Sequence, residues 1–139
     1  MLKKNLDILQ RRFPQVLQRI LAVGEKKPSQ LYYDDASRLL AIRPKGDFPV
    51  YGTRAKERLI EDWFGALRLK NESLYSLSGF GDGSHVRHFL KNTSGGIFLL
   101  IMEVDAAILK ETFSRHDCSD ILRHERFLLG TGQINEDFF

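Results

Sequence analysis

The chain has 139 residues, of which 42% are hydrophobic and 28% charged, so we expect one globular domain with a real core. Its net charge of +3 comes without a long run of Lys or Arg, so it is only weak evidence for an acidic partner, and no specific nucleic acid is expected. The single Cys118 excludes an internal disulfide and a zinc site of several cysteines, and it favours a reducing, cytoplasmic setting.

Residues 2–23 carry an apolar stripe that is typical of an amphipathic helix. Pro14 is expected to begin a new turn or a second helix, because proline suits the first helical position, and Gly24 to end it. The other face is basic and consists of Lys3, Lys4, Arg11, Arg12 and Arg19. We interpret this face as solvated, with binding to a nucleic acid or an anionic surface as the alternative.

Residues 31–33 and 39–43 are expected to pair as a β-hairpin, since 34–37 supply turn residues between them. Pro44, Gly46 and Pro49 then indicate a loop. Thr53 is expected to cap the helix that follows, and Trp63 lies on the apolar face of that helix as a core residue. We therefore divide a single compact domain into an appendage of helices and hairpin (1–52) and a Rossmann-like unit (53–139).

The central stretch, residues 74–103, has the layout of a nucleotide-binding α/β unit. A strand over 74–78 is followed by a turn with Gly79, Gly81 and Gly83, and then by a helix that Ser84 is expected to cap. An apolar strand over 97–102 comes next, with Glu103 at its carboxyl end, 20 residues after Gly83. The turn lacks the Lys-Ser or Lys-Thr pair of a P-loop.

This spacing makes Gly79, Gly81, Gly83 and Glu103 the candidate ligand-binding residues. The glycines permit a tight exit from the strand and a close approach of the backbone to a ligand, and the helix N-terminus suits an anion. Glu103 is placed to accept hydrogen bonds from the hydroxyls of a ribose. The alternative is that Glu103 caps the next helix or meets solvent.

Other chemistry-bearing residues form no recognisable constellation. His85 and His88 lie one turn apart on a helix and are interpreted as surface residues rather than metal ligands. Cys118 lies beside His116, but adjacency in sequence does not make a nucleophile and its base, so we interpret Cys118 as a small buried thiol. No catalytic residue is assigned and no metal is expected.

The remaining elements complete an α/β fold. Asp105 is expected to cap one helix, Asp117 or Ser119 to start a short second one, and 127–129 to form a third strand. The fold class is therefore a Rossmann-like partial parallel sheet of about three strands, with an N-terminal helical segment and a β-hairpin. Such a sheet usually has five to seven strands, so we expect it to be truncated at the C-terminus. Its edge would then require a homodimer partner, a further domain or the N-terminal helices as cover.

Five stretches also carry a family resemblance: KNLDILQRRFP, VYGTRAKERLIEDWF, SGFGDGSHVRHFL, IMEVDAAILKETF and DCSDILRHERFLLGTG. Together they resemble the N-terminal part of motility accessory factor-type proteins, bacterial glycosyltransferase-like proteins linked to flagellin glycosylation. The 6-hydroxymethylpterin diphosphokinase-like domains share the central motif. The resemblance implies a Rossmann-like N-terminal domain that binds a nucleotide-type ligand, such as a nucleotide sugar, or positions a following transferase domain.

The central motif is also similar to motif I of class I methyltransferases, in which the glycines and the acid hold S-adenosylmethionine. That similarity gives the alternative function, an S-adenosylmethionine-binding, methyltransferase-like protein. A third is a non-catalytic interaction domain whose glycine turn is only structural. In each case these 139 residues are not expected to catalyse a reaction by themselves, and no membrane span is expected, because the longest strongly apolar run is only 97–102.

Overall fold

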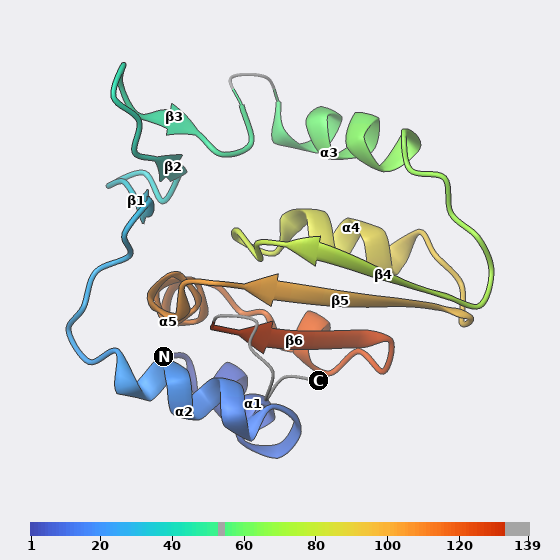
Figure 1. Ribbon diagram of the computed structural model, residues 1–139, viewed down its shortest axis with the longest axis horizontal. Coiled ribbons are helices and arrows are strands. Elements are labelled where there is room, and N and C mark those ends of the chain that lie inside the picture. The colour runs from blue at the N-terminus through green and yellow to red at the C-terminus, as the bar shows by residue number, and fades with distance from the viewer. Residues whose placement is uncertain (53–54, 133–139) are drawn as a thin grey trace.

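Two sheets and six helices make up the described part of the chain, residues 1–52 and 55–132 of a computed structural model (Figure 1). The elements in chain order are α1 (Lys3–Arg12), α2 (Pro14–Ala22), β1 (Leu31–Tyr33), β2 (Leu39–Ala41), β3 (Phe48–Pro49), α3 (Lys56–Gly65), β4 (Ser73–Ser78), α4 (Ser84–Lys91), β5 (Ile97–Glu103), α5 (Ala106–Arg115), α6 (Ser119–Leu122) and β6 (Phe127–Thr131). None of these helices is long and apolar enough to cross a bilayer.

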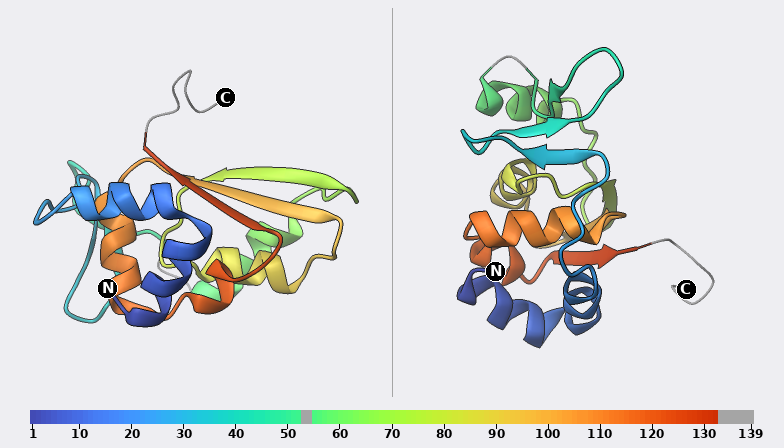
Figure 2. Two further views of the ribbon diagram at one scale, coloured as in Figure 1. Left: turned by 90° about the horizontal axis from the view of Figure 1, so that it is seen from below. Right: turned by 90° about the vertical axis from the view of Figure 1, so that its left-hand side faces the viewer.

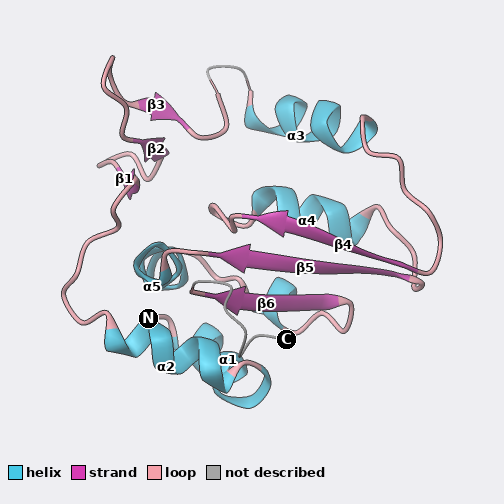
Figure 3. Cartoon of the chain, viewed as in Figure 1, coloured by secondary structure: helices cyan, strands magenta, loops and turns pink. Residues whose placement is uncertain are grey.

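The larger sheet is parallel, in the order β4-β5-β6 (Figure 3). Its register aligns Ser78 with Met102 and Glu103 with Thr131, so the carboxyl ends of all three strands meet at one edge. The sheet confirms the α/β class and the partial parallel sheet expected from the sequence. β5 lies in the centre, with β4 on one side and β6 on the other.

The helices gather on one side of this sheet (Figure 2, left). On that side Leu99 and Ile101 are fully buried, together with Phe80, Phe89 and Phe127 from the turn, α4 and β6. The opposite side is bare over its amino-terminal half, where Leu74 is 59% exposed and Phe98 and Leu128 are each 40% exposed. Among the described residues, the amino-terminal half of the parallel sheet is thus covered on only one of its two faces.

The N-terminal helices belong to the same core as the sheet. The rings of Phe13 and Phe127 meet edge to face with centroids 6.0 Å apart. Arg12 donates hydrogen bonds to the carbonyl oxygens of Leu122, His124 and Phe127. The interpretation of the whole basic face as solvated is therefore wrong for Arg12, whose guanidinium satisfies backbone acceptors at the end of α6.

The smaller sheet contains the expected hairpin, because β1 and β2 pair antiparallel. The side chain of Asp34 accepts hydrogen bonds from the backbone N–H groups of Ala36 and Arg38 and so closes the turn. A third strand, β3, pairs with β2 where the sequence indicated only a loop. It is a two-residue edge strand, a position that tolerates Pro49 because the missing N–H is not needed there.

The helix starts only partly follow the sequence. Asp105 caps α5 as expected, since its Oδ1 accepts from the N–H of Ala107. Ser84, expected as the cap of α4, is instead its first residue, and its N–H donates to Asp82 Oδ1. Thr53 lies outside the described residues, and α3 begins at Lys56.

Candidate functional site

The glycine turn joins β4 to α4 with three left-handed residues. The φ angles of Gly79, Gly81 and Gly83 are +89°, +58° and +85°. A Cβ at Gly83 would lie 3.0 Å from both Phe80 and Ile121 side chains, and a Cβ at Gly81 would lie 2.6 Å from the Tyr51 hydroxyl. Glycine is required at both positions by conformation and by packing.

Glu103 lies against this turn, but as a buried brace. It is 5% exposed, its Oε1 accepts from the N–H of Phe80 at 3.3 Å, and its Oε2 accepts from the N–H of Asp105 at 3.2 Å. Burial raises the pKa of Glu103 above its ordinary value, because a desolvated carboxylate is costly to ionise. The structure thus brings Glu103 to the glycine turn through the fold's own hydrogen bonds.

Asp82 supplies a second carboxylate at the turn. Its Oδ1 accepts from Ser84 N–H at 2.9 Å, and its Oδ2 forms an ion pair with Lys56 Nζ at 2.9 Å. Burial by itself raises the pKa of Asp82, but the hydrogen bonds from Ser84 and Lys56 outweigh it and lower the pKa to about 2. Asp82 is therefore ionised at neutral pH and occupies the N-terminus of α4.

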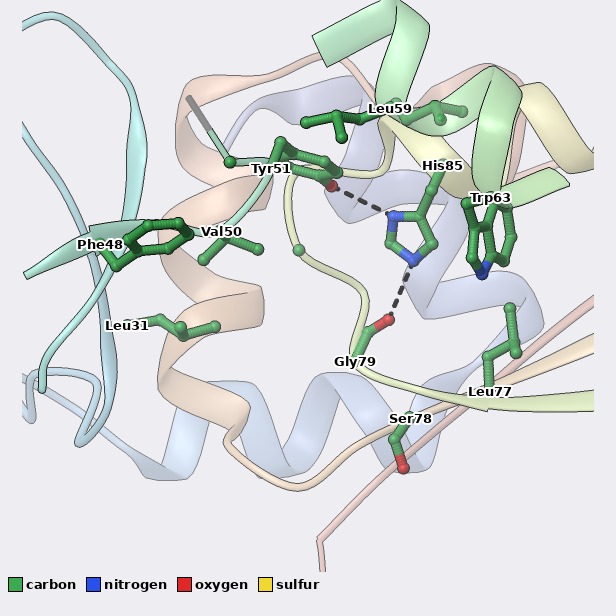
Figure 4. A pocket seen from close by; sticks show the side chains of 13 residues that line it. Leu31, Phe48, Val50, Tyr51, Leu59, Trp63, Leu77, Ser78, Gly79 and His85 are labelled. Atoms are coloured by element: carbon green, nitrogen blue, oxygen red, sulfur yellow. Dashed lines mark hydrogen bonds between the residues drawn. The ribbon is translucent and has the colours of Figure 1, made fainter. Parts of the chain in front are cut away.

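Tyr51 and His85 connect the smaller sheet to the turn (Figure 4). His85 Nε2 lies 3.2 Å from the carbonyl oxygen of Gly79, which can only accept, so Nε2 carries the proton. His85 Nδ1 then accepts from the Tyr51 hydroxyl at 3.1 Å, and the Tyr51 oxygen accepts from Asp82 N–H at 3.2 Å. Burial lowers the pKa of His85, which agrees with this neutral tautomer.

A pocket of about 520 Å³ lies between the smaller sheet, α3 and the end of β4 (Figure 4). Its volume falls within the range of small-molecule sites. The described residues that line it carry no charge: Leu31, Phe48, Val50, Tyr51, Gly52, Leu59, Ile60, Trp63, Leu77, Ser78, Gly79, Gly81 and His85. Trp63 packs against the core, as the helix pattern predicted, and also forms part of the pocket wall.

The structure separates the four candidate residues. Gly79 and Gly81 line the pocket, whereas Gly83 faces the core and Glu103 lies on the β5 side of the turn, outside the pocket lining. Ribose binding by Glu103 stays a prediction. The sequence interpretation missed Tyr51, Trp63 and His85 as a group, because no local motif joins three residues from separate elements.

The other candidate groups serve packing. His85, expected at the surface, is partly buried with both ring nitrogens in hydrogen bonds. Cys118 is fully buried, and burial raises the pKa of its thiol to about 12, so it is protonated and unreactive at neutral pH. Within the described residues, no group of three His, Cys, Asp or Glu side chains is placed to hold a metal ion.

Comparisons of this chain with protein-family models, with curated proteins and with solved structures find no match in any of the three.

Tyr51→Phe is expected to lower the free energy of unfolding by about 1–2 kcal/mol, because both Asp82 N–H and His85 Nδ1 lose their partner in a partly buried setting. The measurement is urea unfolding followed by circular dichroism. Tyr32→Phe is the matched control: its hydroxyl bonds Asp47 at an exposed position, so a change within about 0.5 kcal/mol is expected. Equal losses in the two variants would contradict a structural role for the Tyr51 hydroxyl.

Stability is expected to fall as the pH decreases below about 6.5, the ordinary pKa of histidine. The folded state holds the pKa of His85 below that value, so the unfolded chain binds the proton first and is favoured by acid. The pKa values of His116 and His124 are also lowered and act in the same direction, while the raised pKa of Glu103 acts in the opposite one.

The His85→Asn variant should therefore show a shallower dependence of unfolding free energy on pH between about 5 and 6.5. If the unfolded state binds one proton more than the folded state, the unfolding free energy changes by about 1.4 kcal/mol per pH unit. Chemical unfolding at several pH values measures the slope. An unchanged slope would mean that His85 takes up its proton equally in the folded and unfolded states.

Proposed function

We propose that this chain is a Rossmann-like domain that binds a nucleotide-type small molecule, as a domain of a glycosyltransferase-like protein of the motility accessory factor type would. One observation carries the proposal: a pocket of about 520 Å³, with no charged side chain in its described lining, lies directly against Gly79 and Gly81 of the turn. Ligands of open α/β sheets bind outside the carboxyl ends of the strands, and this pocket begins where β4 ends. We place this binding in the cytoplasm, in keeping with a single buried thiol.

The lining favours a flat ring with little charge. Trp63 lies at one end of the lining, and Phe48 of β3 and Val50, which follows β3, lie at the other end (Figure 4). The polar end of the ligand would approach the backbone at Gly79 and Gly81, where no side chain intervenes. S-adenosylmethionine and a nucleotide sugar both have this division into ring and polar end, and both are candidates.

The proposal is for binding, without chemistry by this chain itself. Tyr51 and His85 are the titratable rings in the described lining, and the Tyr51 hydroxyl and both His85 nitrogens already form hydrogen bonds within the protein. A general acid or base needs a proton position that faces the substrate. The groups that react would therefore come from elsewhere, for example from a transferase domain.

A ligand panel tests the proposal. S-adenosylmethionine, nucleotide sugars and dinucleotides are added in turn, and thermal unfolding is recorded together with the fluorescence of Trp63, the single tryptophan. A true ligand at 100 times its dissociation constant should stabilise the fold by about 2.7 kcal/mol. It should also change the Trp63 emission, because the indole lines the pocket.

Val50→Trp fills the pocket and should abolish the thermal shift. Its matched control is Val104→Trp, which places the same ring at a position that is 72% exposed and outside the pocket lining. The control should keep the full shift. If no compound stabilises the wild-type chain, or if both variants respond equally, the binding proposal fails.

The bare sheet face supports a second candidate function, the positioning of a partner domain. Parallel sheets are normally covered on both faces, yet Leu74, Phe98 and Leu128 are substantially exposed here. β4 is also an edge strand, so its outward N–H and C=O groups have no strand neighbour among the described residues. The exposed face and the free edge of β4 adjoin each other, so one partner could cover both.

The right-handedness of crossovers between parallel strands indicates what kind of partner would fit the exposed face and edge. The crossovers β4-α4-β5 and β5-α5-α6-β6 run in one direction and place their helices on one face. A right-handed connection that returned to the free edge of β4 would place its helix on the bare face. A helix about 10 Å wide matches the span of three strands at about 4.8 Å spacing. One helix followed by one parallel strand would therefore cover both features.

Truncation of Leu74 tests whether this face is free. Leu74→Ala should change the unfolding free energy by less than about 0.5 kcal/mol, because Leu74 is 59% exposed and the described residues leave most of its side chain uncovered. The matched change on the covered face, Leu99→Ala, should cost about 2–5 kcal/mol. Urea unfolding measures both. A large loss from Leu74→Ala would show that the face is already covered and would remove the basis for a partner.

A further inference from the structure

Most backbone donors of the glycine turn are already engaged within the protein. The N–H groups of five residues in this turn donate within the protein: Gly79 to Met102 O, Phe80 to Glu103 Oε1, Asp82 to Tyr51 Oη, Gly83 to Phe80 O and Ser84 to Asp82 Oδ1. A turn that binds phosphate instead presents such N–H groups free to its ligand. This turn therefore has few donors left for a phosphate.

A carboxylate of the protein itself already occupies the place at this turn where an anion would bind. The Asp82 carboxylate lies at the N-terminus of α4, where a bound phosphate would otherwise interact with the helix dipole. Lys56, the described cation that contacts the turn, is paired with Asp82 at 2.9 Å. A phosphate would have to displace Asp82 from both Lys56 and Ser84 before it gained equivalent contacts.

The described lining of the pocket contains no cation that would compensate a negative charge. Its described lining is aliphatic, aromatic or uncharged polar. Moving an unpaired phosphate into such surroundings carries a large desolvation cost, whereas an uncharged ring gains from the same surface.

Resting on the proposed function, we propose that the ligand places an uncharged ring in the pocket and presents a neutral or cationic group to the glycine turn. A nucleoside, or a nucleoside with a sulfonium group, meets this requirement, and a nucleoside diphosphate does not. Asp82 is the specificity-determining residue, because it fills the position that a phosphate would take. The turn thus disfavours a phosphate, while its glycines still allow a nucleoside to come close to the backbone.

The test compares ligands that differ only in their phosphates, adenosine with ADP and uridine with UDP. Dissociation constants come from calorimetry and from the fluorescence of Trp63. In the wild-type chain at least one nucleoside should bind about tenfold or more tightly than its diphosphate, as expected for a charge repelled at a partly buried site. Raising the salt concentration should narrow this ratio, because the repulsion is screened.

Asp82→Asn should weaken or reverse the preference. The amide oxygen of asparagine can still accept from the Ser84 N–H, so this contact at the helix start is kept, while the negative charge is lost and Lys56 becomes free to contact a phosphate. Asp35→Asn is the matched control: it makes the same change in net charge at an exposed position in the hairpin turn and should leave the ratio as in the wild type.

A second variant works in the opposite direction and does not depend on the fold tolerating Asp82→Asn. Lys56→Gln leaves Asp82 ionised without its partner, so the preference for the nucleoside should increase. Tighter binding of the diphosphates by the wild-type chain would overturn the inference and leave the proposed function standing. If neither nucleosides nor diphosphates bind, the proposed function fails, and the inference fails with it.

Discussion

Satisfying the backbone donors of the glycine turn is the constraint on which this structure depends. The turn lies over the core, and Phe80 within it is fully buried against Phe113 and Phe127. Each N–H left without a partner there would cost about 1–3 kcal/mol. Glu103 and Asp82 remove that cost, and in doing so they tie the end of β5 and the start of α4 to one rigid loop.

Much of the fold could be predicted because its signals are local. The apolar run of β5, the Asp105 cap and the turn residues of the hairpin each depend on a few neighbouring positions. The misses arose where a distant partner decides the outcome. Arg12 looks like a surface cation until the carbonyl groups at the end of α6 lie beside it, and Phe48–Pro49 becomes a strand only because β2 offers it an edge.

The candidate site was less predictable for the same reason. Gly79 and Gly81 could be found, because glycine at a strand-to-helix turn has a local cause. Tyr51 comes from the loop after β3, Trp63 from α3 and His85 from α4, and only the folded chain places them around one pocket. Helical periodicity correctly puts Trp63 on an apolar face, but it contains no information on whether a neighbouring element closes over that face completely.

The fold itself accounts for the glycine pattern, so the pattern is not evidence for a ligand. Gly83 is needed because a side chain would collide with Phe80, and Gly81 because one would collide with the Tyr51 hydroxyl. The acid at the end of β5 is likewise accounted for by the N–H groups that it accepts. None of these residues requires a ligand to explain it. The case for a ligand therefore depends on the pocket, whose apolar walls are left unfilled by the side chains of the described chain.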